Sequence, residues 1–346
     1  MAKPNKYFPS KQPGPQRQQK RMVESLLDAM VDGKEYQSLL NVTPNNIEFG
    51  SELRRAIKDI EDIRKRPLVV YAGNVIKPLG NNEISYPDDL PFSEMISAVP
   101  TTDSLDVLIV TPGGLAQQVS QFVNKVRPRF TNVSMILPYM AMSAGTIWAL
   151  SGNDILMDQR AFIGPIDPQV VGKDGRFVPA QAILMLLKRI QESGEENMKK
   201  GLSPDWSDRL ILQNIDAKEI GNALSQSQYS IQLATEYLKK YKFRDWKIHG
   251  DGTPVTTGEV VTAATEIARK LCSHEYWKVH SNGISREVAW DELKIKIDHP
   301  EATPGLERAI RRFWALLYWL FDNTPLVKLF LSQQYTLFKT SPTPKQ

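Results

Sequence analysis

The sequence predicts an α/β protein with a mainly parallel sheet and helical additions at both ends. Two observations predict this class. Between Pro67 and Asp158, apolar runs typical of buried strands alternate with amphipathic helical patterns, and the segments on either side of this region have helical periodicity. Strands that alternate with helices are joined by right-handed crossovers, which make neighbouring strands parallel. With 346 residues, the chain is long enough to bury a substantial core.

The N-terminal part is predicted to contain two regions. Residues 1–21 carry six Lys or Arg residues and no acid, and their Pro and Gln content cannot form a core, so we expect a disordered basic arm. The arm lacks the apolar stretch of a signal peptide. We interpret it as a solubilising tail without a specific nucleic-acid partner, and contact with nucleic acid or an anionic membrane is the alternative. Residues 22–66 follow as a helical N-terminal region.

Residues 67–200 are predicted to form the core of the fold. The expected strands are RPLVVYAGN, SLDVLIVTPGG, NVSMILPY and DILMD. The expected helices are LAQQVSQFVNKVRP, SAGTIWALSG and PAQAILMLLKRIQES. The last of these begins beside Pro179, which is tolerated in a first helical turn.

The remaining residues are predicted to be mostly helical. Residues 201–300 form a helical extension that completes or caps the core, and residues 301–346 form an aromatic, apolar, helical tail. Polar residues interrupt this tail, so it contains no clean run of about 20 apolar residues that could span a bilayer. We interpret the tail as packing against the domain or another subunit, and association with a membrane surface is the alternative.

Cysteine and histidine usage limits the cofactor chemistry. The single cysteine, Cys272, excludes an intramolecular disulfide framework and a multi-cysteine zinc site, and it favours a reducing, cytoplasmic location. The segment with His274, Glu275 and His280 lacks the spacing of a helical His-Glu-x-x-His site. We therefore expect no metal and no cofactor, with zinc in this segment as the alternative.

Two corners at strand ends carry the candidate chemistry. Gly113 and Gly114 follow one predicted strand, and Ser143 stands where the next strand meets a helix. Acyl transfer needs a nucleophilic oxygen and N–H donors for the developing oxyanion, which a glycine turn and a helix N-terminus both offer. Open α/β sheets place their ligands at the carboxyl ends of strands, where both corners lie. A tight turn and a helix cap are the structural alternatives.

These segments resemble a known family. The stretches LDVLIVTPGGLAQQVSQFVNKV, NVSMILPYMAMSAGTIWALSGNDILMD and AFIGPIDPQ resemble the Clp-fold serine peptidases of the Clp protease and crotonase superfamily. They are most similar to the serine dehydrogenase proteinase (SDH) group, which is related to signal peptide peptidase A. The resemblance implies a ClpP/crotonase-like fold of repeated ββα and βαβ units. It also implies a serine peptidase in which Ser143 is the nucleophile and the amides of Gly113, Gly114 and Ala144 form the oxyanion hole.

The general base is a separate question. None of the four histidines follows Ser143 closely enough to match the histidine of the Clp protease subunit, so we expect no histidine triad. The helix around Lys188 resembles the one that carries the base in membrane-linked relatives, which implies a Ser-Lys dyad. Lys188 follows an apolar run, and desolvation there would lower the pKa of its amine toward neutrality. The solvated edge of an amphipathic helix is the alternative for Lys188, and Lys173 is the second candidate.

Two further residues have possible supporting roles. Asp167, in GPIDPQ, either orients the base or belongs to a turn between two prolines. His274 belongs to a segment that resembles part of the SDH group, and we interpret it as packing at an interface or a substrate groove.

Three functions remain open at this level. A peptidase would act on a protein or peptide and, as is usual in the superfamily, we expect a homo-oligomer. A crotonase-like acyl-CoA enzyme would use similar backbone amides but generally needs an acidic residue near the serine corner. A non-catalytic oligomeric scaffold of the same fold is the third possibility.

Overall fold

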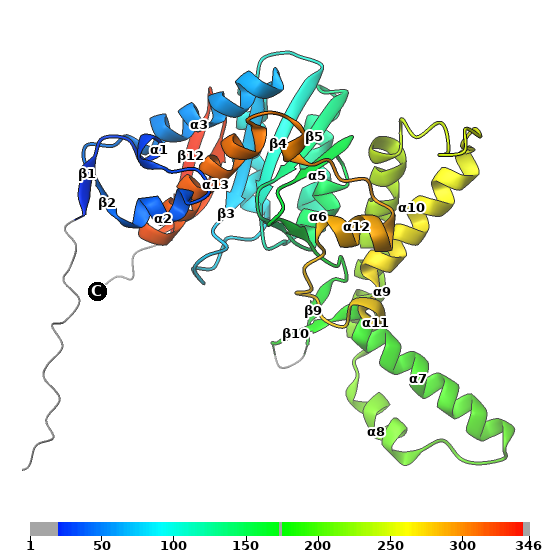
Figure 1. Ribbon diagram of the computed structural model, residues 1–346. Coiled ribbons are helices and arrows are strands. Elements are labelled where there is room, and N and C mark those ends of the chain that lie inside the picture. The colour runs from blue at the N-terminus through cyan, green and yellow to red at the C-terminus, as the bar shows by residue number, and fades with distance from the viewer. Residues whose placement is uncertain (1–19, 173–174, 342–346) are drawn as a thin grey trace, which may run out of the picture.

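A six-stranded sheet forms the centre of the protein (Figure 1). The structure is a computed structural model and describes residues 20–172 and 175–341. The sheet has the strand order β12-β11-β3-β4-β5-β7, and all pairs from β3 to β7 are parallel. Its strands are β3 (Leu68–Gly73), β4 (Ser104–Val110), β5 (Asn132–Leu137), β7 (Asp154–Met157), β11 (Leu326–Leu331) and β12 (Thr336–Thr340). The predicted α/β class with a mainly parallel sheet is therefore confirmed.

Both faces of the sheet are buried. Along β3, Val69 and Tyr71 enter one apolar cluster, whereas Leu68 and Val70 enter a second cluster on the opposite face, as the two-residue period of a strand requires. The first cluster includes residues of α4 (Asp89–Ala98), α5 (Ala116–Val126), α6 (Ala144–Ala149), α9 (Ala217–Tyr237) and α10 (Thr257–Cys272). The second cluster includes residues of α1 (Leu26–Ala29), α2 (Glu35–Leu40), α3 (Phe49–Arg64) and α13 (Leu306–Asn323). The result is three layers, with the sheet in the middle.

The N-terminal region contains strands as well as helices. β1 (Arg21–Val23) and β2 (Val42–Pro44) form a short parallel pair, so this region is not wholly helical. Glu48 caps α3 by accepting hydrogen bonds from the amides of Gly50 and Ser51. Most of the predicted basic arm, residues 1–19, lies outside the described residues.

The C-terminal region corrects the prediction of a helical tail. It contains one long helix, α13, and then the antiparallel strands β11 and β12. β11 pairs with β3, a partner far away in the sequence that no local pattern can reveal. The aromatic side chains Phe313, Trp314, Trp319 and Phe321 of α13 are buried inside the protein. Intramolecular packing thus accounts for the apolar character of this helix.

The helical extension lies at the opposite end of the sheet. It contains α8 (Trp206–Asn214), α9, the π-helical turn η2 (Leu238–Lys242), α10, α11 (His274–Trp277), α12 (Arg286–Leu293) and the start of the 3-10 turn η3 (Pro300–Ala302). The helix α7 (Ala180–Lys199), which was predicted as part of the core, precedes it. α7 and α8 project away from the body of the molecule (Figure 1). Across the part of the chain that is described, no helix combines the length and the apolar character needed to cross a membrane.

Short elements shape the end of the sheet where the two predicted corners lie. They are η1 (Tyr86–Asp88), β6 (Met140–Ala141), β8 (Phe162–Ile163), β9 (Gln169–Val171) and β10 (Phe177–Pro179). β6 pairs in parallel with β8, and β9 pairs antiparallel with β10. These elements surround the carboxyl ends of β4 and β5.

Candidate active site

Ser143 occupies a strained corner between β6 and α6. Its backbone has φ 52° and ψ −116°, a conformation that residues with a side chain rarely adopt. The side chain makes no capping hydrogen bond to α6. The cap interpretation is therefore not supported, and the hydroxyl is not engaged by its own helix.

The glycine turn lies directly against this corner. A Cβ atom on Gly113 would stand 2.8 Å from the Cβ of Ser143 and 2.9 Å from the carbonyl oxygen of Met142. A Cβ atom on Gly114 would stand 2.2 Å from the carbonyl oxygen of Ile84. Both glycines also have positive φ angles, 114° and 132°. Glycine is thus required at both positions by close backbone contacts as well as by conformation.

Only some of the predicted oxyanion donors are available. The amide of Gly113 already donates to the hydroxyl of Thr111 at 3.1 Å. The Ile84–Gly114 bridge uses the Ile84 amide, which donates to Gly113 O, and the Leu115 amide, which donates to Ile84 O, so it does not use the Gly114 amide. Ala144 is the first residue of α6, and its amide therefore has no acceptor within the helix.

A cavity of about 660 Å³ opens beside the two corners. Ser143, Ala144 and Gly114 line it, whereas Gly113 does not. Many of the other lining side chains are apolar, among them Leu115, Ile147, Ile166, Val170, Val171 and Phe177. A polar row on one face of α9 completes the wall: Asn222, Gln226 and Ser230. The cavity therefore joins a free serine hydroxyl, two backbone N–H groups and a mainly uncharged surface.

His280 lines the same cavity as Ser143. Its Nδ1 atom lies 2.8 Å from Oδ1 of Asp167, whose side chain is 1% exposed. A histidine that donates from Nδ1 to a carboxylate keeps Nε2 free to accept a proton. Asp167 is thus hydrogen-bonded to an imidazole that lines the same cavity as Ser143.

His280 is a candidate base that no sequence pattern singled out. It lies 113 positions along the chain from Asp167, on the loop between α11 and α12, whereas the expected histidine would have followed the serine closely. One feature of the sequence could have drawn attention to His280: the segment SHEYWKVHSNG contains two histidines, and turn residues follow the second one. Only the folded chain brings this loop back to the GPIDP segment.

His274 approaches the other oxygen of the same carboxylate. Its Nδ1 atom lies 3.4 Å from Oδ2 of Asp167. Within residues 20–172 and 175–341, no group of three or more His, Cys, Asp or Glu residues is arranged to hold a metal ion.

The predicted lysine base lies elsewhere. The side chain of Lys188 is 77% exposed, forms an ion pair with Glu192 at 3.7 Å, and is absent from the cavity wall. The burial expected for it is therefore not found, because α7 projects away from the core and carries Lys188 into solvent. Lys173, the second candidate, lies outside the described residues.

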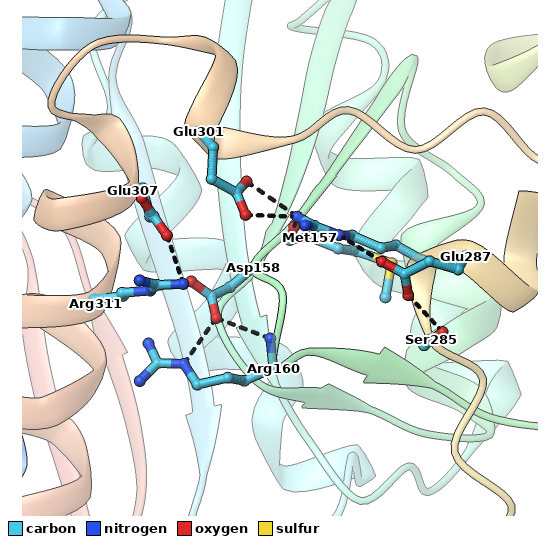
Figure 2. A network of polar contacts seen from close by, with 9 residues as sticks. Met157, Asp158, Arg160, Ser285, Glu287, Glu301, Glu307 and Arg311 are labelled. Carbon is cyan, nitrogen blue, oxygen red and sulfur yellow. Dashed lines mark hydrogen bonds and ion pairs between the residues drawn. The ribbon is translucent and has the colours of Figure 1, made fainter. Parts of the chain in front are cut away.

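A network of ion pairs fixes the segment that follows His280. Ile284 exchanges backbone hydrogen bonds with Ile163 of β8 at 2.8 and 3.1 Å. The guanidinium of Arg286 binds Glu301 at 2.8 and 3.0 Å and the carbonyl oxygen of Met157 at 3.3 Å (Figure 2). This segment is therefore held against β7 and β8 rather than free to move.

Asp158 extends the network to α13. Burial opposes ionisation of its carboxyl group, but hydrogen bonds from Arg160 and Arg311 keep its pKa below the ordinary value (Figure 2). The carboxylate therefore joins the end of β7 to α13.

With this geometry established, comparison with known proteins decides the family. Residues 88–246 match the sequence model of a family described as ClpP-like SDH-type serine proteinases. This segment is an SDH-type proteinase region. It contains the glycine turn, Ser143 and Asp167, but it ends before His274 and His280. The family suggested by the sequence motifs is thereby confirmed.

The chain is similar to two uncharacterized proteins of Methanocaldococcus jannaschii. One is 26% identical over 195 residues, which cover 56% of this chain and 62% of the relative. The other is 30% identical over 162 residues, which cover 45% of this chain and 51% of the relative. The chain thus spans about half to three fifths of the length of the relatives it matches.

Solved structures with a similar arrangement include a mutant of the 1510-N membrane-bound stomatin-specific protease. It has 14% identity and a TM-score of 0.36, and the match covers 62% of this chain and 74% of that protein. A mutant of ClpP1 from Listeria monocytogenes has 15% identity and a TM-score of 0.25, with 48% and 92% covered. TM-scores this low establish neither function nor assembly.

Proposed function

We propose that this chain is a serine peptidase in which Ser143 is the nucleophile, His280 the general base and Asp167 the residue that orients the base. The observation that carries the proposal is that Ser143 and His280 line one cavity while Nδ1 of His280 is bonded to a buried carboxylate. The SDH-type family match supports the reaction class. The exposure of Lys188 favours the histidine over the Ser-Lys dyad.

The reaction follows from these positions. Nε2 of His280 takes the proton of Ser143 as Oγ attacks the substrate carbonyl, and the resulting imidazolium is stabilised by Asp167. The amides of Gly114 and Ala144 donate to the oxyanion. His280 then protonates the leaving amine, and a water molecule activated by the same imidazole hydrolyses the acyl-serine. Gly113 contributes by letting the two corners approach each other.

The substrate is proposed to be a peptide or an unfolded protein segment. The cavity wall is mostly apolar or uncharged, which suits side chains without charge. A homo-oligomer and a cytoplasmic location, peripheral to a membrane or not, remain predictions from the sequence.

The test compares three variants with the wild-type protein on a fluorogenic peptide library and on casein. Ser143→Ala should abolish hydrolysis and labelling by a fluorophosphonate. His280→Asn keeps a donor toward Asp167 but has no atom at Nε2, so we expect a loss of about 10²–10⁴-fold in kcat. Lys188→Met separates the two candidate bases, because activity would survive it only if the lysine is not the base.

Matching unfolding transitions would show that the variants are folded. Full activity of Ser143→Ala would refute the peptidase proposal. Full activity of His280→Asn together with loss in Lys188→Met would restore the dyad. Acyl-CoA esters serve as the comparison substrates, and turnover of these without turnover of any peptide would favour the crotonase-like alternative.

A further inference from the structure

The carboxylate of Asp167 has two histidine neighbours but only one hydrogen bond. Oδ1 is bonded to His280, whereas Oδ2 and Nδ1 of His274 are both buried and neither has a hydrogen-bond partner among the described residues. These two unpaired atoms face each other at 3.4 Å. The separation is too short for a water molecule to stand between them.

A buried polar atom left without a partner costs about 1–3 kcal/mol, and nearly all such atoms in folded proteins are paired. A small rotation of either side chain would turn this contact into a hydrogen bond. The bond requires the proton on Nδ1, because a lone pair there would face a carboxylate oxygen. Nδ1–H is therefore the tautomer that suits His274.

The backbone around both residues is well fixed. His274 is the first residue of α11, whose cap Ser273 accepts a hydrogen bond from the amide of Tyr276. On the other side, the amide of Ile166 donates to the carbonyl oxygen of Leu271 at the end of α10. The two segments are thus tied together beside Asp167, so their side chains need little rearrangement to meet.

We infer that His274 is a positioning residue for the catalytic group: its Nδ1–H donates to Oδ2 of Asp167 and keeps Oδ1 directed at His280. The inference rests on the proposed function, since it assumes that His280 is the base. Asp167 is then held from both sides by imidazoles. Without His274, the carboxylate could rotate about its χ2 torsion, and the orientation of His280 would be lost in part.

The side chains of Asn and Leu provide a matched test at this position. They are nearly equal in size and shape, but Asn places an N–H donor close to where Nδ1 stands, whereas Leu has none. His274→Leu should lower kcat by about 10–100-fold with little change in KM, a loss comparable to removing an outer partner of a ligating histidine. His274→Asn should retain activity within a few-fold of the wild-type protein.

Steady-state kinetics on one peptide substrate and thermal unfolding would be measured for both variants. Wild-type kcat in His274→Leu would overturn the inference. Equal loss in the Asn and Leu variants would also overturn it, because the donor would then not be what matters. If His274→Leu fails to fold, the Asn variant still decides through its kcat. An active His280→Asn protein would instead refute the proposed base, whatever the His274 variants do.

Discussion

At the scale of single residues, the backbone strain at Ser143 is the clearest sign of function. A residue with a side chain in this conformation costs about 1–3 kcal/mol. The corner is held by backbone hydrogen bonds from Thr111 to Met140, from Met142 to Thr111 and from Gly145 to Met142. These bonds fix the residues on both sides, so Ser143 stays in the strained conformation.

Gly113→Ala should damage this corner. The new Cβ would meet Ser143 and Met142 at under 3 Å, and alanine would also have to adopt a φ angle of 114°. We expect a loss of at least 2 kcal/mol in the free energy of unfolding, about the cost of one strained residue plus overpacking, and a loss of most hydrolytic activity. Urea denaturation and peptide turnover would measure the two effects.

Gly33→Ala is the matched control, because it tests the cost of a positive φ angle at a position where a new Cβ would meet no other atom. Gly33 has φ 75°, but nothing lies within 4 Å of a Cβ placed there. It should cost about 1 kcal/mol of stability and leave activity unchanged. If both substitutions lowered stability and activity equally, the close contact between Gly113 and the Ser143 corner would not matter.

The serine corner and the glycine turn could be located from sequence because their signals are local. A serine among small residues and a PGG turn each stand next to an apolar strand. His280 could not be identified in this way, because its role depends on a contact with Asp167 that forms only when the loop after α11 returns to β8. The prediction that the Lys188 side chain is buried was wrong. An apolar run before a lysine indicates burial only where that part of the helix packs against the protein, and α7 carries Lys188 into solvent.

At the scale of elements, β11 brings a buried cation to the wall of the cavity. The side chain of Lys328 is 1% exposed, and its Nζ atom lies 2.7 Å from Oδ2 of the fully buried Asp88. The same Nζ donates to the carbonyl oxygen of Glu83 at 2.6 Å. Glu83 and Ser85 line the cavity, so the C-terminal hairpin supports a wall of the candidate site.

Lys328→Met should be strongly destabilising, since it leaves Asp88 buried with fewer compensating groups. We expect a loss of about 3 kcal/mol in the free energy of unfolding, as is usual when one partner of a buried ion pair is removed. The midpoint of urea denaturation should fall with an unchanged slope.

Lys339→Met is the matched comparison. Lys339 contacts the other oxygen of Asp88 at 2.9 Å, but its side chain is 31% exposed. Its loss should cost about 1 kcal/mol or less. A larger effect at Lys339 than at Lys328 would contradict the view that burial decides the strength of this network.

The parallel strands were predicted correctly because each one contains a short apolar run and helical patterns separate the runs, even though Asp106 interrupts β4 and Ser134 interrupts β5. β11 was missed because it follows the apolar pattern of α13 directly and Lys328 interrupts LVKLFL, and a lysine in the middle of a strand suggests an exposed position. The buried partner that permits it, Asp88, lies 240 positions away. Local pattern cannot distinguish such a strand from the end of the preceding helix.

At the scale of the whole molecule, one buried and two partly buried groups link stability to alkaline pH. Burial raises the pKa of the Cys272 thiol from 9.0 to about 12, and the charge of Asp167 acts in the same direction. Burial and hydrogen bonds to carboxylates raise the pKa values of Tyr36 and Tyr335 to about 12. The unfolded chain loses these protons near pH 9 and pH 10, whereas the folded protein keeps them. Their contribution is therefore complete below pH 9 and is lost as the pH rises toward 12.

The contribution of these three groups to the free energy of unfolding should accordingly decline above pH 9, by up to about 1.4 kcal/mol per pH unit for each group. Cys272→Ala should remove the earliest part of this decline, so that it begins near pH 10. Urea denaturation at half-unit steps from pH 8 to pH 11 would measure the slopes. Identical slopes for the variant and the wild-type protein would show that the thiol is not kept protonated by folding.

The pairing of β11 with β3 also sets an order of events during translation. When the ribosome has made residues 68–157, the parallel strands and Ser143 are present, but the outer edge of β3 is unpaired and Asp88 lacks its buried cation. The strand that pairs with β3 and the lysine that binds Asp88 emerge only when residues 326–340 leave the exit tunnel. A growing chain therefore carries Ser143 long before its cavity is complete, and we expect the proposed peptidase activity to be absent while the chain is still bound to the ribosome.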